Sequence, residues 1–269
     1  MADSNPFDLS GRRAMITGGT QGVGAAIAVE LARAGADVLL TGLESDAPAL
    51  QTLQACRAFG TRAELVTVDM SVPPSDYLEG LLAAADEKLP GIDLLVNNAG
   101  TYIDKPYFEM DFQRYLTTIH LNVTAGYFLT QAITRRWVEA GVAGRVLFTG
   151  SINGVLSEPD HTAYDTSKGA VAAMVRSLCV TLAPHNIRVN AMAPGLVRTP
   201  LTNVSNEDAR LDSWMKLHTP NQKVPGPEVC AGAALFLLSD AAEHVQGQTL
   251  LVDGGMSVWQ QPDVPPNWG

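Results

Sequence analysis

Cysteine is scarce in this chain of 269 residues, which contains only Cys56, Cys179 and Cys230. They are odd in number, lie far apart and form no C-x-x-C pair. This pattern excludes a disulfide framework and a thiolate zinc site, and it favours buried thiols in a reducing compartment such as the cytoplasm. The five histidines form no H-E-x-x-H motif or close cluster, so no metal centre is expected.

Basic residues are in the minority, with 18 Lys and Arg against 28 Asp and Glu and a net charge of −10. This balance argues against nucleic acid or an anionic membrane as a partner. No apolar run approaches the roughly 20 residues that cross a bilayer. The first residues show no basic segment followed by an apolar one, so no secretory signal is predicted.

Apolar, strand-like runs alternate with amphipathic segments of helical length along the chain. Strands are expected at 13–17, 36–42, 64–69, 93–100, 144–150, 187–194 and 249–255. Helices are expected at about 26–35, 47–60, 76–89, 111–140 and 163–182. Such alternation builds a parallel sheet covered on both faces.

No linker or repeat interrupts this alternation. The sequence therefore predicts a single α/β domain over residues 1–269, with a short C-terminal tail from about 260. The expected fold is a Rossmann-like, doubly wound, mostly parallel seven-stranded sheet with helices on both faces.

The segment TGGTQGVG (Thr17–Gly24) follows the first expected strand and opens the first helix. Its glycines, Gly18, Gly22 and Gly24, allow a tight turn in which backbone N–H groups approach a pyrophosphate closely. The spacing G-x-x-x-G-x-G differs from the usual dinucleotide fingerprint, and a purely structural turn is the alternative. The position between strand and helix favours a phosphate-binding loop.

The segment YDTSK places Tyr164 and Lys168 one helical turn apart. A tyrosine with a pKa of about 10 is a poor base at neutral pH. A cation about 4 Å away is worth about 4 kcal/mol at an effective dielectric of about 20, so Lys168 is predicted to lower the Tyr164 pKa from about 10 towards a limit of about 7. A solvated helix face is the alternative for this pair taken alone.

Six motifs occur in order over about residues 11–255: TGGTQGVG, NNAG (Asn97–Gly100), Asn122 in HLNV, Ser151 in FTGSING, YDTSK, and Pro194–Gly195 in APGLVRT. Together they resemble the short-chain dehydrogenase/reductase family. The resemblance implies a nicotinamide-dependent oxidoreductase with Tyr164 as the acid–base residue. It also implies that Ser151 bonds the substrate oxygen and that Lys168 holds the nicotinamide ribose. Asn122 would hold a water that links Lys168 to solvent, with packing inside the helix as the alternative.

The end of the second strand bears on the choice of cofactor. Where many NAD-dependent members of the family carry aspartate, this chain has Gly42, but Glu44 lies twenty residues after Gly24, about where a ribose-binding acid is expected. No basic residue stands nearby to meet a 2′-phosphate, so we predict NAD, without excluding NADP. Solvation of a loop by Glu44 and Asp46 is the alternative. The residues assigned to the cofactor are Gly18, Thr20, Gln21, Gly22, Val23, Gly24, Glu44, Asp69, Met70, Asn98, Ala99, Gly100, Tyr164, Lys168, Pro194, Gly195, Val197 and Thr199.

Polar side chains fill the segment between Ser151 and Tyr164, which reads INGVLSEPDH from Ile152. Such donors and acceptors suit a ligand with several hydroxyls. We therefore predict a sugar or polyol dehydrogenase, working on a secondary alcohol or its ketone. The residues predicted to contact substrate are Ser151, Asn153, His161 and Tyr164.

Other readings of this segment and of the substrate stay open. A solvated loop explains the polarity equally well, and Leu201, Trp214 and Met215 would suit an apolar ligand. A reductase of 3-oxoacyl thioesters or of bulkier cyclic alcohols, and a dinucleotide-binding sensor without catalysis, are the alternatives. The negative net charge counts against an acidic acyl-carrier protein as partner, and the presence of Ser151, Tyr164 and Lys168 counts against the sensor.

The resemblance also implies a homotetramer, in which the helices expected at 111–140 and 163–182 each pack against a neighbouring copy. The second of these carries small and apolar residues on more than one face, which indicates burial on several sides. Burial within the monomer is the alternative. Beyond Trp259 lie Pro262, Pro265, Pro266 and Trp268, a stiff segment that docks on a subunit or stays disordered.

Overall fold

The computed structural model describes residues 5–202 and 209–259. The described strands form one seven-stranded sheet in the order β3-β2-β1-β4-β5-β6-β7, and each neighbouring pair is parallel. These strands are β1 (Arg13–Ile16), β2 (Asp37–Gly42), β3 (Ala63–Thr67), β4 (Leu94–Asn97), β5 (Arg145–Thr149), β6 (Arg188–Pro194) and β7 (Thr249–Val252). The predicted doubly wound, Rossmann-like sheet is confirmed.

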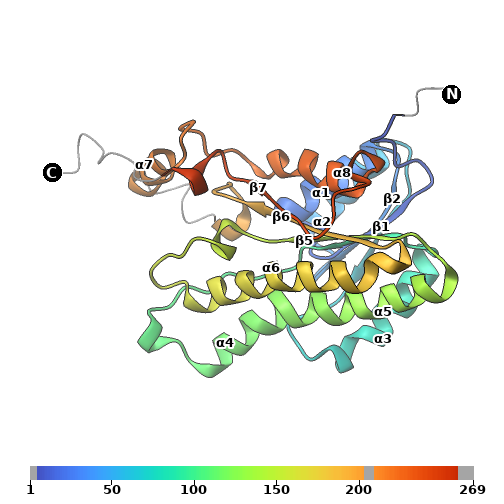
Figure 1. Cartoon of the computed structure of the whole chain (residues 1–269), viewed down its shortest axis with the longest axis horizontal. Coiled ribbons are helices and arrows are strands. Elements are labelled where there is room, and N and C mark those ends of the chain that lie inside the picture. Colours follow the sequence, from blue (N-terminus) through green and yellow to red (C-terminus); the bar gives the residue numbers. More distant parts are fainter. Residues whose placement is uncertain (1–4, 203–208, 260–269) are drawn as a thin grey trace.

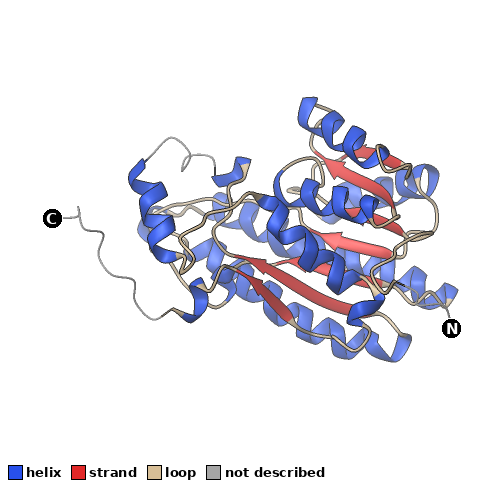
Figure 2. Cartoon of the chain, turned by 90° about the horizontal axis from the view of Figure 1, so that it is seen from above, coloured by secondary structure: helices blue, strands red, loops and turns tan. Residues whose placement is uncertain are grey.

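Helices cover the sheet on both faces, as Figure 1 shows. The helices α1 (Gly22–Arg33), α2 (Ala47–Arg57) and α8 (Ala231–Leu238) lie on one face. The other face carries α3 (Pro74–Lys88), α5 (Ala125–Ala140) and α6 (Thr162–Leu182). The shorter α4 (Phe112–Ile119) precedes α5, and α7 (Ala209–His218) lies at one end of the molecule. Seen from above, the strands run side by side beneath the helices (Figure 2).

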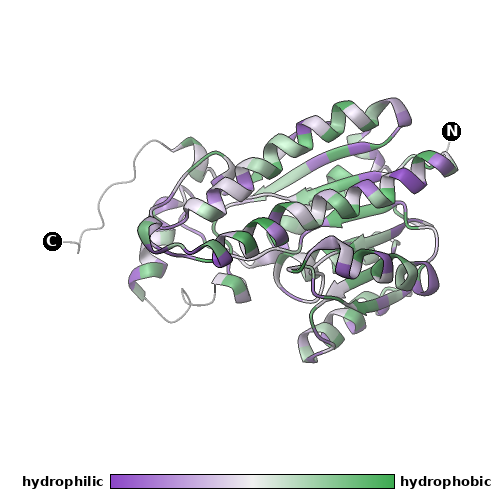
Figure 3. Cartoon of the chain, turned by 90° about the horizontal axis from the view of Figure 1, so that it is seen from below, coloured by the Kyte–Doolittle hydropathy of each residue, from purple (hydrophilic) through white to green (hydrophobic). Residues whose placement is uncertain are grey.

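Each face of the sheet buries a hydrophobic core of its own. Within β1, Ala14 and Ile16 join the core under α1 and α8, whereas Met15 joins the core under α3, α5 and α6. Successive side chains of a strand point to opposite faces, so a strand buried on both sides reads as a continuous apolar run. Figure 3 shows the strands mostly in hydrophobic colours and the helices over them in both.

The predicted helix over 111–140 contains a wider, π-helical turn in the structure. Asp111 caps α4 by accepting the N–H of Arg114 at 2.8 Å, and a π-helical turn at His120–Thr124 then separates α4 from α5. The predicted extent is confirmed, because residues 112–140 are helical throughout. The π-turn itself was not predicted, because apolar periodicity does not register a single wider turn. Asn122 lies in this turn, and such turns often mark functional sites.

Within the described residues, no helix has both the length and the apolarity needed to cross a membrane. The predicted C-terminal tail from residue 260 lies outside the described residues, as does the segment 203–208.

Candidate active site

The candidate site lies at the carboxyl edge of the sheet. The strand β1 pairs with β2 on one side and β4 on the other, so the chain's winding reverses between β1 and β4. Open α/β sheets bind ligands in the crevice outside this switch point. The loops that follow β1, β4, β5 and β6 carry most of the residues predicted from the sequence.

The glycine loop after β1 is locked to the NNAG segment after β4. The hydroxyl of Thr17 accepts the N–H groups of Asn98 and Ala99 at 2.9 and 3.0 Å, and the Asn98 amide donates to the carbonyls of Thr17 and Gly18, both at 3.0 Å. A Cβ at Gly24 would lie 2.2 Å from the Gly18 carbonyl oxygen and 2.4 Å from Asn98 Nδ2. Only glycine fits there, and the missing side chain lets the backbone of Gly18 lie close to the first turn of α1. This cradle fits the pyrophosphate of a dinucleotide.

The segment after β6 closes over the same loop. A Cβ at Gly22 would lie 3.6 Å from Thr199 Cβ, so the two segments are in contact distance. The Thr202 hydroxyl accepts the Thr199 N–H at 3.0 Å and donates to the Val197 carbonyl at 2.9 Å, which fixes the turn. The structure thus brings the residues predicted for the nicotinamide end next to the phosphate loop.

The remaining predicted cofactor residues lie along the same edge. Asp69 accepts the N–H and hydroxyl of Ser71 at 2.8 and 2.6 Å, and these bonds lower its pKa. Met70 is buried with its sulfur 4.0 Å from the Thr41 hydroxyl. The others hold these positions: Thr20, Gln21 and Val23 around the start of α1, Gly100 beside Asn122, Pro194 at the end of β6, and Gly195 directly after it.

The acids at the end of β2 divide into two roles. Asp46 accepts the Ala49 N–H at 3.0 Å and caps α2, which supports a structural reading of that residue. Glu44 is exposed and stands free of such a cap. A Cβ at Gly42 would lie 2.6 Å from Thr20 Cγ2, so the volume of an aspartate at that position is already taken by Thr20.

Ser151, Tyr164 and Lys168 converge beyond the end of β5. Ser151 follows β5 by two residues, while Tyr164 and Lys168 occupy the first two turns of α6. The Lys168 ammonium is buried, donates to the Thr149 carbonyl at 3.1 Å and lies 5.5 Å from the centre of the Tyr164 ring. The helical spacing thus brings the phenol and the ammonium to one place, as the sequence predicts.

The expected lowering of the Tyr164 pKa is wrong for this structure. Burial raises the pKa of Tyr164 to about 12, and a hydrogen bond with the Ser151 hydroxyl opposes that rise only in part. Burial also lowers the pKa of Lys168 to about 8. The simple Coulomb argument omitted the cost of moving both charged forms out of water, and burial is the largest cause of both pKa shifts here.

The side-chain amide of Asn122 joins two segments of the site. It accepts the Thr101 N–H at 2.8 Å, and it donates to the Thr101 carbonyl and to Ser167 Oγ, both at 3.0 Å. These bonds tie the loop after β4 to α6. Asn122 also lines a cavity of about 10 Å³, room for about one water. Asn97, on the same cavity, keeps a buried carbonyl oxygen that no described residue bonds, and a water there would satisfy it.

Asn153, predicted to contact substrate, is bonded within the protein. Its backbone N–H donates to Ser151 Oγ at 3.1 Å. Its side-chain oxygen Oδ1 accepts from the same hydroxyl at 3.3 Å, and its side-chain NH₂ donates to Asp165 at 2.8 Å. Asn153 is also buried. These contacts orient the Ser151 hydroxyl.

His161 lies at the centre of a cluster that the sequence revealed only in part. Its Nδ1 is 2.6 Å from the Glu158 carboxylate, outside hydrogen-bond alignment, and its Nε2 is 2.9 Å from Asp104 and hydrogen-bonded to the Tyr102 hydroxyl. The Tyr102 ring packs edge-on against Tyr164 with the ring centres 5.0 Å apart. Tyr102 and Asp104 were missed. Their one available signal was their position, two and four residues after NNAG.

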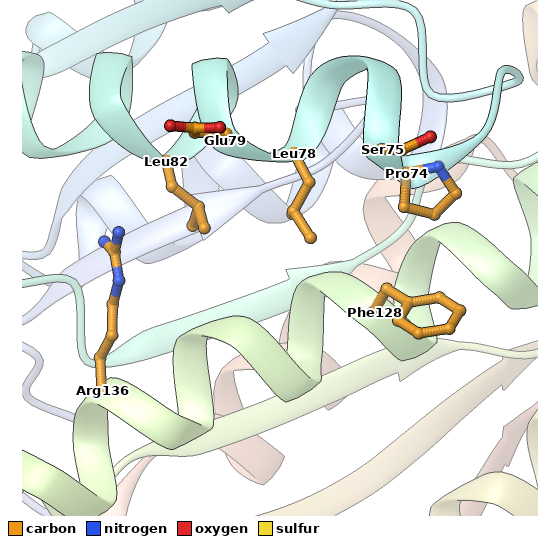
Figure 4. Close-up of a pocket in the computed structure, with 7 residues that line it drawn as sticks. All are labelled: Pro74, Ser75, Leu78, Glu79, Leu82, Phe128 and Arg136. Carbon is orange, nitrogen blue, oxygen red and sulfur yellow. The ribbon is translucent and has the colours of Figure 1, made fainter.

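A larger hollow, of about 550 Å³, lies elsewhere, between α3 and α5 (Figure 4). Leu78 and Leu82 of α3 point into it toward Phe128 and Arg136 of α5. None of the predicted site residues lines it. Among the described residues, no three His, Cys, Asp or Glu side chains are grouped so as to hold a metal ion.

Comparisons with known proteins agree with this geometry. A family model described as Enoyl-(Acyl carrier protein) reductase matches residues 18–257. The chain is 35% identical to 5-keto-D-gluconate 5-reductase of Escherichia coli over 94% of its length and 98% of that protein. It is 33% identical to L-rhamnose 1-dehydrogenase (NADP(+)) of Thermoplasma acidophilum, covering 94% and 98% of the two chains. A gluconate 5-dehydrogenase from Burkholderia cenocepacia, solved with NADP and tartrate, superposes with a TM-score of 0.87 at 29% identity and 95% and 98% coverage.

Proposed function

This chain belongs to the short-chain dehydrogenase/reductase family, and we propose that it interconverts a secondary alcohol of a sugar or polyol with the corresponding ketone, using a nicotinamide dinucleotide. The observation that carries this proposal is the convergence of Ser151, Tyr164 and Lys168 at the carboxyl edge of the sheet, beside the glycine cradle at the switch point. When bound, the nicotinamide supplies or accepts the hydride.

The proton at the substrate oxygen is the task of Tyr164. With its pKa raised to about 12, the phenol is neutral at physiological pH and suited to donate a proton to a carbonyl oxygen. Ser151, oriented by Asn153, would donate a second hydrogen bond to the same oxygen. In the reverse direction Tyr164 takes the alcohol proton, with Lys168 stabilising the phenolate.

The cradle, Thr199 and Lys168 would hold the dinucleotide, with Asn122 supporting the loop beside it. We propose a preference for NAD over NADP, because Glu44 is exposed just after β2 and the neighbouring Thr20, Gln21 and Leu43 carry no positive charge. A carboxylate at this edge bonds a free ribose hydroxyl and repels a 2′-phosphate. A fluorescence titration of the protein with NADH and NADPH tests this, and tighter binding of NADPH would refute the preference.

Relatives named for 5-keto-D-gluconate and L-rhamnose support a substrate of the sugar class. The test is a panel of aldoses, alditols, aldonates and 3-oxoacyl thioesters, assayed with both cofactors at 340 nm. We expect turnover within the polyhydroxylated compounds. Turnover of a 3-oxoacyl thioester, with none of any polyhydroxylated compound, would overturn the sugar assignment.

We further propose that residues 1–269 form one catalytic domain and assemble into a homotetramer through the outer faces of α4, α5 and α6. Support comes from the exposed apolar side chains there, namely Phe112, Tyr127, Phe128, Val138 and Val180. The three cysteines are unpaired, which supports a reducing, cytoplasmic location. A monomer by light scattering at micromolar concentration would refute the tetramer.

A further inference from the structure

Two loops that together carry three carboxylates meet beside the catalytic phenol. One is residues 101–106 after β4, and the other is residues 157–161 before α6; together we call them the acidic loop pair. The Lys105 N–H donates to the Asp160 carbonyl at 3.0 Å and joins them. They form a side of the site that none of the family motifs covers.

The imidazole of His161 holds the acidic loop pair together. It is buried, 11% exposed in its side chain, between Glu158 on one loop and Asp104 on the other. The Asp104 side chain is 48% exposed, so its carboxylate also reaches the solvent at the edge of the site. Burial raises the pKa of Glu158, and the neighbouring His161 works against that rise.

These carboxylates act at the reacting position. The Tyr102 ring, in contact with His161, packs edge-on against Tyr164. Burial is the main cause of the raised pKa of Tyr164, and the carboxylates of Asp165, Glu158 and Asp104 raise it further. A field that disfavours a phenolate at this point also disfavours an anionic substrate there.

Positive charge does not balance this field. The acidic loop pair carries three carboxylates, Asp104, Glu158 and Asp160, with one lysine and one histidine, and a fourth carboxylate, Asp165, follows in the first turn of α6. Lys168 adds one positive charge beside Tyr164, since its bond to the neutral Thr149 carbonyl leaves that charge in place, whereas Arg198, on the segment after β6, is paired with Asp212. The histidine, even when charged, is held between two of the four carboxylates.

We propose that the acidic loop pair selects by charge, so that the substrate is an uncharged sugar or polyol and not an aldonate or another carboxylate-bearing sugar. This inference rests on the proposed function and narrows it. It predicts that this chain differs in substrate charge from its relatives named for keto-gluconate and gluconate.

A series of three compounds tests the charge alone. D-Gluconate, D-sorbitol and D-glucamine share the hydroxyls of carbons two to six and differ only at the first carbon. That carbon is a carboxylate in gluconate, a CH₂OH group in sorbitol and a CH₂NH₃⁺ group in glucamine. We expect kcat/KM for sorbitol to exceed that for gluconate at least about tenfold, with glucamine equal to sorbitol or better. Raising the salt concentration to about 0.5 M should reduce the difference in kcat/KM between sorbitol and gluconate, because salt screens partly exposed charges. Matched alditol–aldonate pairs of other configurations extend the test.

The double variant Asp104→Asn with Glu158→Gln then assigns the effect to the acidic loop pair. We expect the ratio of kcat/KM for gluconate to that for sorbitol to rise at least about fivefold. Glu87→Gln, which removes one exposed negative charge at the far end of α3, should leave the ratio as in the wild type. If the double variant fails to fold, the three-compound series with the wild-type protein and its salt dependence still decide whether the substrate is selected by charge.

Equal or better turnover of gluconate than of sorbitol would overturn the charge selection while leaving the sugar dehydrogenase intact. Glucamine as poor as gluconate would also overturn it, because the sign of the charge would then not matter. Absence of turnover for every polyhydroxylated compound would instead refute the proposed function itself, and the inference with it.

Discussion

The two halves of the site are built in different ways. The cofactor half, formed by the glycine loop and the NNAG segment, is held by hydrogen bonds of 2.9–3.0 Å to backbone groups and has no volume to spare at Gly24. The substrate half beyond Tyr164 is made of charged and aromatic side chains on two loops. The first half depends on where the backbone runs, and the second depends on which side chains the loops carry.

This difference predicts how each half responds to substitution. A pyrophosphate is bound by N–H groups and a helix N-terminus, which demand glycine at set positions. Loops at the edge of a sheet tolerate substitution and carry specificity. Changes in the cofactor half should therefore affect every substrate alike, and changes in the acidic loop pair should affect substrates according to their charge.

The largest expected effect is that of Tyr164→Phe, which removes the proton donor on which both halves converge. We expect kcat to fall by about a thousandfold, in the range of general acid–base catalysis, with NADH binding retained. Tyr77→Phe is the matched control, because Tyr77 is also buried, with its pKa raised to about 12, but it lies on α3 and its hydroxyl has no partner among the described residues. More than about a tenth of wild-type kcat in Tyr164→Phe, a loss below about 1.4 kcal/mol, would refute the role.

The buried Lys168 should make the free energy of unfolding depend on pH. In the unfolded chain a lysine holds its proton to about pH 10.5, whereas burial lowers the Lys168 pKa to about 8. Between these values the unfolded state binds more protons, so stability rises with pH. The difference in unfolding free energy between wild type and Lys168→Met should therefore grow by about 2 to 3 kcal/mol from pH 8 to pH 10 in favour of wild type.

Urea unfolding of both proteins at several pH values measures this change. The raised Tyr164 pKa acts with the opposite sign only above about pH 10, so the series should stop there. The raised pKa values of Cys56 and Cys230 act equally in both proteins and cancel in the difference. A difference that stays flat over this range would show that Lys168 is not deprotonated by burial.

Gly24→Ala tests the cofactor half alone. The new Cβ would meet the Gly18 carbonyl and the Asn98 amide, so the loop must open, and we expect NADH affinity to fall at least about tenfold. Gly80→Ala on α3 has open space around the new Cβ and should stabilise the protein by about 0.5–1 kcal/mol. Unchanged NADH affinity in Gly24→Ala would contradict the cradle.

A smaller effect is expected at the adenosine end. Glu44→Gln should weaken NADH binding by about three- to tenfold and leave NADPH unchanged or improved, because it removes the carboxylate that the ribose hydroxyl would bond. Asp46→Asn removes a charge two residues away but keeps the cap on α2, and it serves as the control. Equal NADH affinity in wild type and Glu44→Gln would show that Glu44 only solvates its loop.

The contrast between the cofactor half and the substrate half also explains which features could be predicted from the sequence. Strand and helix periodicity predicted the sheet, and motif order predicted the convergence of Ser151, Tyr164 and Lys168. The π-turn at Asn122 changes no apolar spacing and was therefore missed. The raised pKa of Tyr164 depends on how deeply the fold buries it, which spacing along the chain does not reveal.

The substrate half was read less well, for a physical reason. His161 was predicted to contact substrate, yet its partners Tyr102 and Asp104 come from a loop about sixty residues earlier, and only the fold brings them together. Asn153 was also assigned to substrate, but its amide holds Ser151 and Asp165. Local sequence shows that a loop is polar, but not which of its polar groups already bond one another.

The central claim, hydride transfer between a nicotinamide ring and a sugar carbon, is tested most directly by isotope transfer. The alditol that is turned over best is prepared with deuterium at the carbon that is oxidised and is incubated with the protein and NAD. Mass spectrometry of the reduced cofactor should show one deuterium, and Tyr164→Phe should give almost none in the same time. A reduced cofactor without deuterium, or a Tyr164→Phe protein that transfers it as fast as wild type, would contradict the account.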